Sequence, residues 1–198
     1  MPQDQNVERV PLADSHARGL LTARRVIAIG LGALVVALAA QVVVPVPFNP
    51  VPMTLQPLAV LVVGGLLGAV GGLSALVLYL VLGMLGLPVF AGGASGALHL
   101  VGPTGGYLLA FPVAAALTGA LIGRSNQGRG SVLRVLLACA LGMVVIHIGG
   151  VAQLALLGGN PGLAFRVGFV PFLTGDLVKI GLAAALILVA GPKIRPLL

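Results

Sequence analysis

Charged residues are scarce in this sequence. Asp, Glu, Lys and Arg make up 8% of its 198 residues, hydrophobic residues make up 59%, and there are four acids in all. A soluble domain usually has about a quarter charged residues. This composition excludes an ordinary soluble protein and indicates an integral membrane protein.

Tryptophan is absent, and the single cysteine, Cys139, lies in an apolar run. No disulfide can therefore form within the chain. The sequence has no G-x-x-x-x-G-K-[ST] phosphate loop, so we expect that the chain alone cannot hydrolyse ATP. Its histidines and acids show neither metal-ligand spacing nor a Ser-His-Asp set. We expect no catalytic centre, no metal and no cofactor.

Five apolar runs separate the polar stretches. Four are long enough for one membrane span each: residues 26–44, 105–123, 132–157 and 171–191. The fifth run, residues 58–90, is uncharged and is interrupted by the glycine-rich stretch 68–72. The first run could also be a signal peptide cut near residues 37–39, but its length favours a span.

Most basic residues lie in three clusters beside these runs: Arg18, Arg24 and Arg25; Arg124, Arg129 and Arg134; Lys193 and Arg195. The positive-inside rule puts all three in the cytoplasm if residues 58–90 form two short helices. We therefore predict an all-α, polytopic membrane domain, residues 24–198, with six transmembrane helices and both termini cytoplasmic. A disordered cytoplasmic tail, residues 1–23, precedes it and could include a short interfacial helix. The clusters indicate orientation in a membrane and no binding to nucleic acid.

Three segments fall on the outer face of this topology: residues 45–57, 88–104 and 158–170. The first has five prolines in thirteen residues, which no regular helix tolerates. Because it is also apolar, we predict a re-entrant or capping loop that folds back over the protein. The second is rich in glycine, which allows a ligand to approach the backbone closely but also suits a tight external turn.

Asp176 and Lys179 lie inside the last apolar run. Charges there are costly and mark functional sites by default. Three residues apart on a helix, the two side chains share one face. A structural ion pair would explain them, but the lack of other deep charges favours a ligand-binding cavity near the outer end of the span.

Other polar residues are weaker candidates. Tyr107 could stack on a ligand or anchor at the membrane interface. His147 falls in mid-span, where a histidine more often bonds another helix than a ligand, and His99 is expected in a loop.

Small residues in the first span form two small-x-x-x-small patterns: Ala28 with Gly32, and Ala33 with Ala37. Such a face allows close helix contact. The contact could be internal, which we favour, or with a partner protein.

Four motifs in order resemble the BioY-type, biotin-specific substrate-binding (S) components of energy-coupling-factor (ECF) transporters. They are V-P-V-P-F-N-P-V-P-M-T-L-Q (44–56), G-L-P-V-F-A-G-G (86–93), G-P-T-G-G-Y (102–107) and P-F-L-T-G-D-L-V-K (171–179). The resemblance implies a six-helix fold that holds biotin near the outer face under the first loop. It also implies a membrane coupling subunit and ATPase subunits as partners.

By position in these motifs, the resemblance implies that Asp176 and Lys179 bind the ureido ring of biotin. It further implies that Gln56 belongs to the capping loop and that Gly93 and Tyr107 belong to the second loop's share of the pocket. Apolar residues such as Phe48, Val89 and Phe90 would line the rest. Two positions depart from the family pattern: Ala94 replaces an Asn, and Leu108 replaces an Arg, of some members. For the biotin carboxylate we rank Ser95 first, then backbone N–H groups of the glycine loop, then Arg166.

We therefore expect a biotin uptake subunit in the cell membrane of a prokaryote, with the small-residue face of the first span as the candidate partner contact. Self-association stays open. A solitary carrier that uses Asp176 to carry a proton is the alternative, and an intramembrane enzyme or a scaffold is a weaker one.

Overall fold

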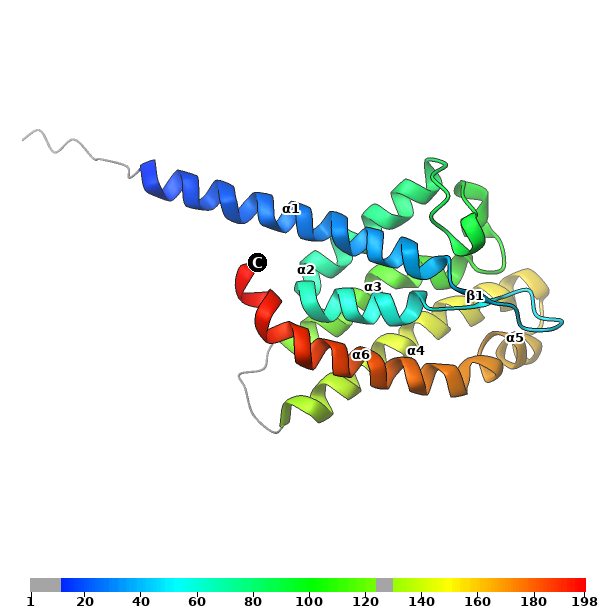
Figure 1. Cartoon of the computed structure of the whole chain (residues 1–198). Helices are drawn as coiled ribbons and strands as arrows, with labels where there is room; N and C mark the ends of the chain where they lie inside the picture. The colour runs from blue at the N-terminus through cyan, green and yellow to red at the C-terminus, as the bar shows by residue number, and fades with distance from the viewer. Residues whose placement is uncertain (1–11, 124–129) are drawn as a thin grey trace, which may run out of the picture.

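The computed structural model describes residues 12–123 and 130–198 as an all-helical protein with one short β-ladder (Figure 1). The long helices are α1 (Leu12–Ala40), α2 (Gln56–Met84), α3 (Gly105–Gly123), α4 (Gly130–Gly158) and α6 (Leu173–Ile194). The shorter elements are β1 (Val43–Val44), β2 (Met53–Thr54), α5 (Pro161–Gly168) and the 3-10 helices η1 (Ala91–Gly93), η2 (Ala97–Val101), η3 (Val170–Phe172) and η4 (Arg195–Leu197). Among the described residues, five segments are long and apolar enough to cross a membrane: Leu21–Ala40, Gln56–Met84, Gly105–Gly123, Val132–Gly158 and Pro161–Leu197. The expectation of an all-α membrane protein is confirmed.

The expected tail, residues 1–23, falls partly outside the described residues. From Leu12 onward the chain is helical in α1, so this part of the expected tail continues into the first span as helix. No proline interrupts residues 12–44, and the first helical turns contain Leu, Ala and Arg, which favour helix.

Gly68 breaks α2. Its φ of 76° and ψ of −178° lie outside the helical region, which a residue with a side chain rarely adopts. A Cβ added at Gly72 would come within 2.8 Å of the Gly64 Cα, whereas eight residues of straight helix span about 12 Å. The chain therefore turns back at Gly68, and Figure 1 shows α2 as two arms that meet near the C-terminal end of the bundle.

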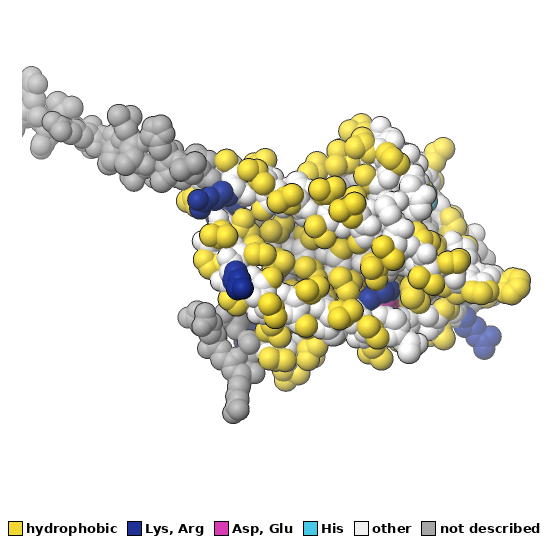
Figure 2. Space-filling model, viewed as in Figure 1, with side chains coloured by type: hydrophobic (Ala, Val, Ile, Leu, Met, Phe, Trp, Pro, Cys, Tyr) yellow, Lys and Arg dark blue, Asp and Glu magenta, His cyan; other side chains and the backbone are white. Residues whose placement is uncertain are grey.

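Arg195 hydrogen-bonds a backbone carbonyl group beside this break. Its guanidinium donates from Nε and Nη2 to the carbonyl oxygen of Gly65, one of the carbonyls that the broken helix leaves without a partner. Arg25 Nε donates to the Leu198 oxygen over 2.6 Å. The first span, the last residues and the turn in α2 are thus joined at one end of the molecule. Figure 2 shows Lys and Arg side chains at this end, further ones in the middle and at the opposite end, and apolar side chains spread over the visible face.

The proline-rich segment is an antiparallel hairpin at the other end (Figure 1). Val43 pairs with Thr54 and Val44 with Met53. Asn49 Nδ2, near the hairpin tip, donates to Val167 O of α5 over 2.7 Å. Figure 1 places the hairpin, the η1–η2 segment and α5 together, away from the C-terminus. These are the three segments that the sequence analysis assigned to one face.

Candidate functional site

Asp176 and Lys179 lie on the first two turns of α6 and face the interior. Their exposed fractions are 6% and 5%, and Lys179 Nζ donates to Asp176 Oδ1 over 3.0 Å. Phe172 is the last residue of η3, directly before α6 begins at Leu173, and it lines the same cavity as the pair. The expected shared face of the two residues is confirmed, and that face lines a cavity.

His147 of α4 completes this cluster. Its Nε2 lies 2.6 Å from Asp176 Oδ2, and its Nδ1 lies 3.2 Å from Gly168 O. The side chain is buried and lines the same cavity. The sequence favoured an interhelical hydrogen bond for His147, which it makes with Asp176 of α6, but did not place it in the pocket. Its mid-span position was the available signal, because polar groups at that depth usually face a bundle interior.

The hydrogen bonds of His147 define where protons must lie. Gly168 O can only accept, so Nδ1 carries a hydrogen. The Nε2–Oδ2 contact also needs one hydrogen, carried either by an imidazolium or by a protonated carboxyl group. With the Lys179 ammonium, the three side chains hold one net positive charge in either arrangement.

Tyr107 and Gln56 also line the cavity, and both are buried. Tyr107 Oη donates to Gly168 O over 2.6 Å, so its hydroxyl bonds protein rather than the membrane interface. Gln56 Nε2 donates to Tyr79 Oη over 2.6 Å, and Gln56 Oε1 accepts from Thr54 Oγ1 over 3.1 Å. Gln56 thus ties the end of the hairpin to the second arm of α2.

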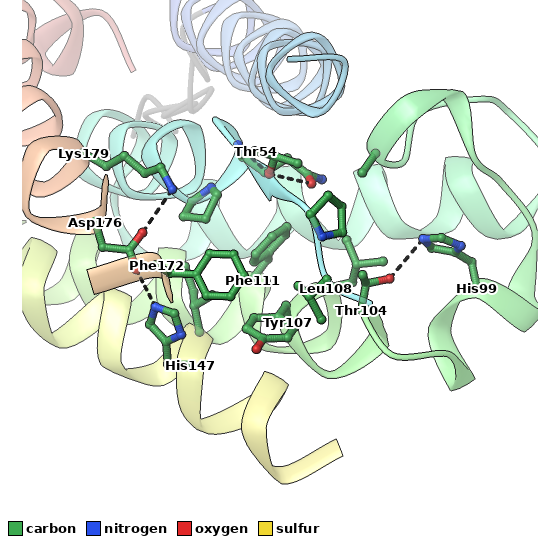
Figure 3. Close-up of a pocket in the computed structure, with 16 residues that line it drawn as sticks. Thr54, His99, Thr104, Tyr107, Leu108, Phe111, His147, Phe172, Asp176 and Lys179 are labelled. Carbon is green, nitrogen blue, oxygen red and sulfur yellow. Dashed lines mark hydrogen bonds and ion pairs between the residues drawn. The ribbon is translucent and has the colours of Figure 1, made fainter. Parts of the chain in front are cut away.

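About 560 Å³ of space among the lining residues is free of protein atoms, including the part that is open to solvent. Figure 3 shows Asp176, Lys179 and His147 at one end and His99 with Thr104 at the other. Apolar side chains separate the two ends: Leu108, Phe111, Ile146 and Phe172. The hairpin closes one side with Val51, Pro52 and Thr54.

The structure does not bring every predicted residue to this cavity. Phe48 is fully exposed near the hairpin tip, where its φ is 58°. Phe90 is fully buried behind the wall, with its ring stacked on that of His99. Gly93 and Ser95 are exposed and do not line the cavity. Ala91 is the residue of their segment that does line it. Arg166 is exposed on α5, also outside the lining.

The small-residue face of α1 packs inside the protein. Gly32 and Ala33 are buried, and a Cβ added at Gly32 would lie 3.1 Å from side-chain atoms of Val63, Leu67 and Ala75 in α2. Ala28 and Ala37 are partly exposed. The centre of this face therefore makes a helix contact within the protein, the first of the two alternatives considered for it.

Within residues 12–123 and 130–198, no three His, Cys, Asp or Glu side chains converge as a metal site would require. With the shared hydrogen on His147, the polar end of the cavity offers one carboxylate beside two nitrogen donors. That set suits a neutral ligand group with both N–H donors and a carbonyl acceptor.

Comparisons with known proteins agree with the motifs. Residues 12–195 match the model of the BioY family. A probable biotin transporter BioY of Pyrococcus horikoshii is 40% identical over 141 residues, which are 71% of this chain and 80% of that protein. The biotin transporter BioY of Thermotoga maritima is 39% identical over 145 residues, 73% of this chain and 83% of that protein. A crystal structure of the S-component for biotin from an ECF-type ABC transporter has a TM-score of 0.74 and 25% identity, and the match covers 84% of this chain and 89% of that one. In sequence and in fold, this chain belongs to the BioY family.

Proposed function

We infer that this protein binds biotin and is the substrate-binding subunit of an ECF-type transporter. The observation that carries this inference is the buried cluster of Asp176, Lys179 and His147 at the polar end of a cavity. The names of the BioY relatives and of the solved S-component support biotin as the ligand.

The ureido ring of biotin suits this end of the cavity. Its two N–H groups would donate to the Asp176 carboxylate, which has lone pairs left after accepting from Lys179 and His147. Lys179 has N–H groups left to donate to the ring carbonyl. The bicycle and the valeryl chain would lie against the apolar middle, where Phe111 and Phe172 offer surface.

We propose six membrane segments for this protein, counting the two arms of α2 separately. Both termini then lie on one side of the membrane, and the three basic clusters favour the cytoplasm for that side. The proline-rich hairpin would act as the outer cap, because Val51, Pro52 and Thr54 line the cavity and Asn49 tethers the tip to α5.

Transport against a gradient would use separate partners, because the sequence has no phosphate loop of its own. We propose a membrane coupling subunit and ATPase subunits as those partners, in the cell membrane of a prokaryote. Their contact would lie along α1 beside the partly exposed Ala28 and Ala37, since α2 covers Gly32 and Ala33 is buried.

Calorimetry of the purified protein with biotin tests the site. Asp176→Ala and Lys179→Ala should each abolish measurable binding, whereas Lys193→Ala, an exposed control, should bind as the wild type does. Unchanged affinity in both site variants would overturn the assignment. Uptake by proteoliposomes without ATPases, driven by a pH gradient and lost in Asp176→Asn, would instead support the solitary carrier.

A further inference from the structure

A second polar pair lies at the far end of the cavity from Asp176 (Figure 3). It consists of His99, in η2, and Thr104, directly before α3, with His99 Nε2 and Thr104 Oγ1 3.1 Å apart. Both side chains line the cavity. Figure 3 shows Tyr107, Leu108 and Phe111 between this pair and Asp176.

This pair always has a hydrogen-bond donor to spare. A neutral histidine and a threonine together carry one N–H and one O–H, and their mutual contact uses one of them. If Thr104 donates to Nε2, the Nδ1–H of His99 stays free. If Nε2–H donates, the Thr104 hydroxyl hydrogen stays free. In the described part of the chain, no other group bonds either side chain.

The surrounding structure holds the pair in place. The His99 ring stacks on Phe90, with centroids 5.3 Å apart and 17° between the planes, and Phe90 is fully buried. Gln153 Nε2 of α4 donates to Leu100 O over 3.0 Å and to Gly102 O over 2.6 Å, which fixes the backbone between the two residues. A donor held in position loses little entropy when it binds a ligand.

Other polar groups that line the cavity already have partners. Thr54 donates to Gln56, Gln56 to Tyr79, and Tyr107 to Gly168 O. At the opposite end, Lys179 and His147 are bonded to Asp176. Gln56 uses one of its two amide N–H groups in this way and keeps the other. At the end of the cavity opposite Asp176, the free donor among the described lining side chains is the one left on His99 or Thr104.

We propose that His99 and Thr104 form a subsite for the carboxylate of the ligand and so select a ligand with an acid at the end of its chain. The alternation of polar end, apolar middle and polar end matches a molecule with a ureido head, an aliphatic chain and a terminal carboxylate. Leu108 lines the cavity as part of the apolar middle. This subsite rests on the proposed binding of biotin.

Calorimetry with biotin and with biotin methyl ester separates the two ends. The ester keeps the ureido ring but has no anionic carboxylate. We expect the wild type to bind biotin about ten- to a hundredfold more tightly than the ester, as for a hydrogen bond to a charged group. His99→Phe keeps a ring to stack on Phe90, and Thr104→Val keeps the shape without the hydroxyl. Each variant should lose most of this preference while its affinity for the ester stays near that of the wild type.

Arg166→Ala is the matched control and should keep the full preference. Equal binding of biotin and ester by the wild type would overturn the subsite, as would a preference that persists in both variants or disappears in Arg166→Ala. Failure of folded wild type to bind either ligand would overturn the proposed function itself, and the subsite with it. Binding of the ester by folded Thr104→Val keeps the test valid even if His99→Phe does not fold.

Discussion

His147 Nε2 lies 2.6 Å from Asp176 Oδ2, while Lys179 Nζ lies 3.0 Å from the other oxygen, Oδ1. The carboxylate is thus held from both sides, by α4 and by its own helix. Because the imidazole is itself held by Gly168 O, the orientation of Asp176 depends on the packing of three segments. A carboxylate fixed in this way is prepared to accept the N–H groups of a ligand.

His147→Leu should weaken biotin binding by about ten- to a hundredfold, because it removes a hydrogen bond to a charged group. His147→Gln should weaken it less, since the amide nitrogen can still donate to Asp176. Calorimetry of the purified variants measures both. Equal affinity of wild type and His147→Leu would show that the contact does not orient Asp176.

Asp176→Asn should lower the free energy of unfolding by about 3–5 kcal/mol, because it leaves the Lys179 ammonium buried without a charged partner. The double variant Asp176→Asn, Lys179→Met should recover much of this stability but no biotin binding. Thermal unfolding in detergent and calorimetry together give both quantities. If the double variant binds biotin as the wild type does, the pair is a structural ion pair alone.

Asn49→Ala should speed the release of bound biotin. The substitution removes the bond from the hairpin to Val167 O, so the proposed cap should open more often. Stopped-flow dissociation measures the rate. Phe48→Ala is the control on the same hairpin, and it should leave the rate unchanged because Phe48 is fully exposed. A larger effect from Phe48→Ala than from Asn49→Ala would contradict the tether.

Gly68→Ala should destabilise the protein by about 1–3 kcal/mol, because a φ of 76° with a ψ of −178° is a backbone conformation almost restricted to glycine. The cost is conformational, since a Cβ at Gly68 would meet no described atom within 4 Å. Gly30→Ala in α1 also meets no described atom within 4 Å, but its backbone lies in regular helix. It should be neutral or stabilising. Equal unfolding temperatures for the two variants would contradict the strained turn in α2.

Local patterns along the chain predicted the helical class, the positions of most apolar spans and the pairing of Asp176 with Lys179. These features depend on short-range physics: an apolar run must be helical to satisfy its backbone in a membrane, and residues three apart on a helix share a face. The glycine interruption at residues 68–72 predicted a turn for the same reason, because Gly68 can adopt a positive φ.

Contacts between distant segments required the tertiary structure. Asp176 and His147 are 29 residues apart, and nothing in either local sequence indicates that α4 and α6 bring them together. Motif position assigned Phe48 and Phe90 to the pocket, but packing puts one in solvent and the other behind the wall. The same packing turns His99 and Thr104 toward the cavity. The sequence determines the chemistry of each side chain residue by residue. The direction in which a side chain points depends on how helices from the whole chain pack against one another.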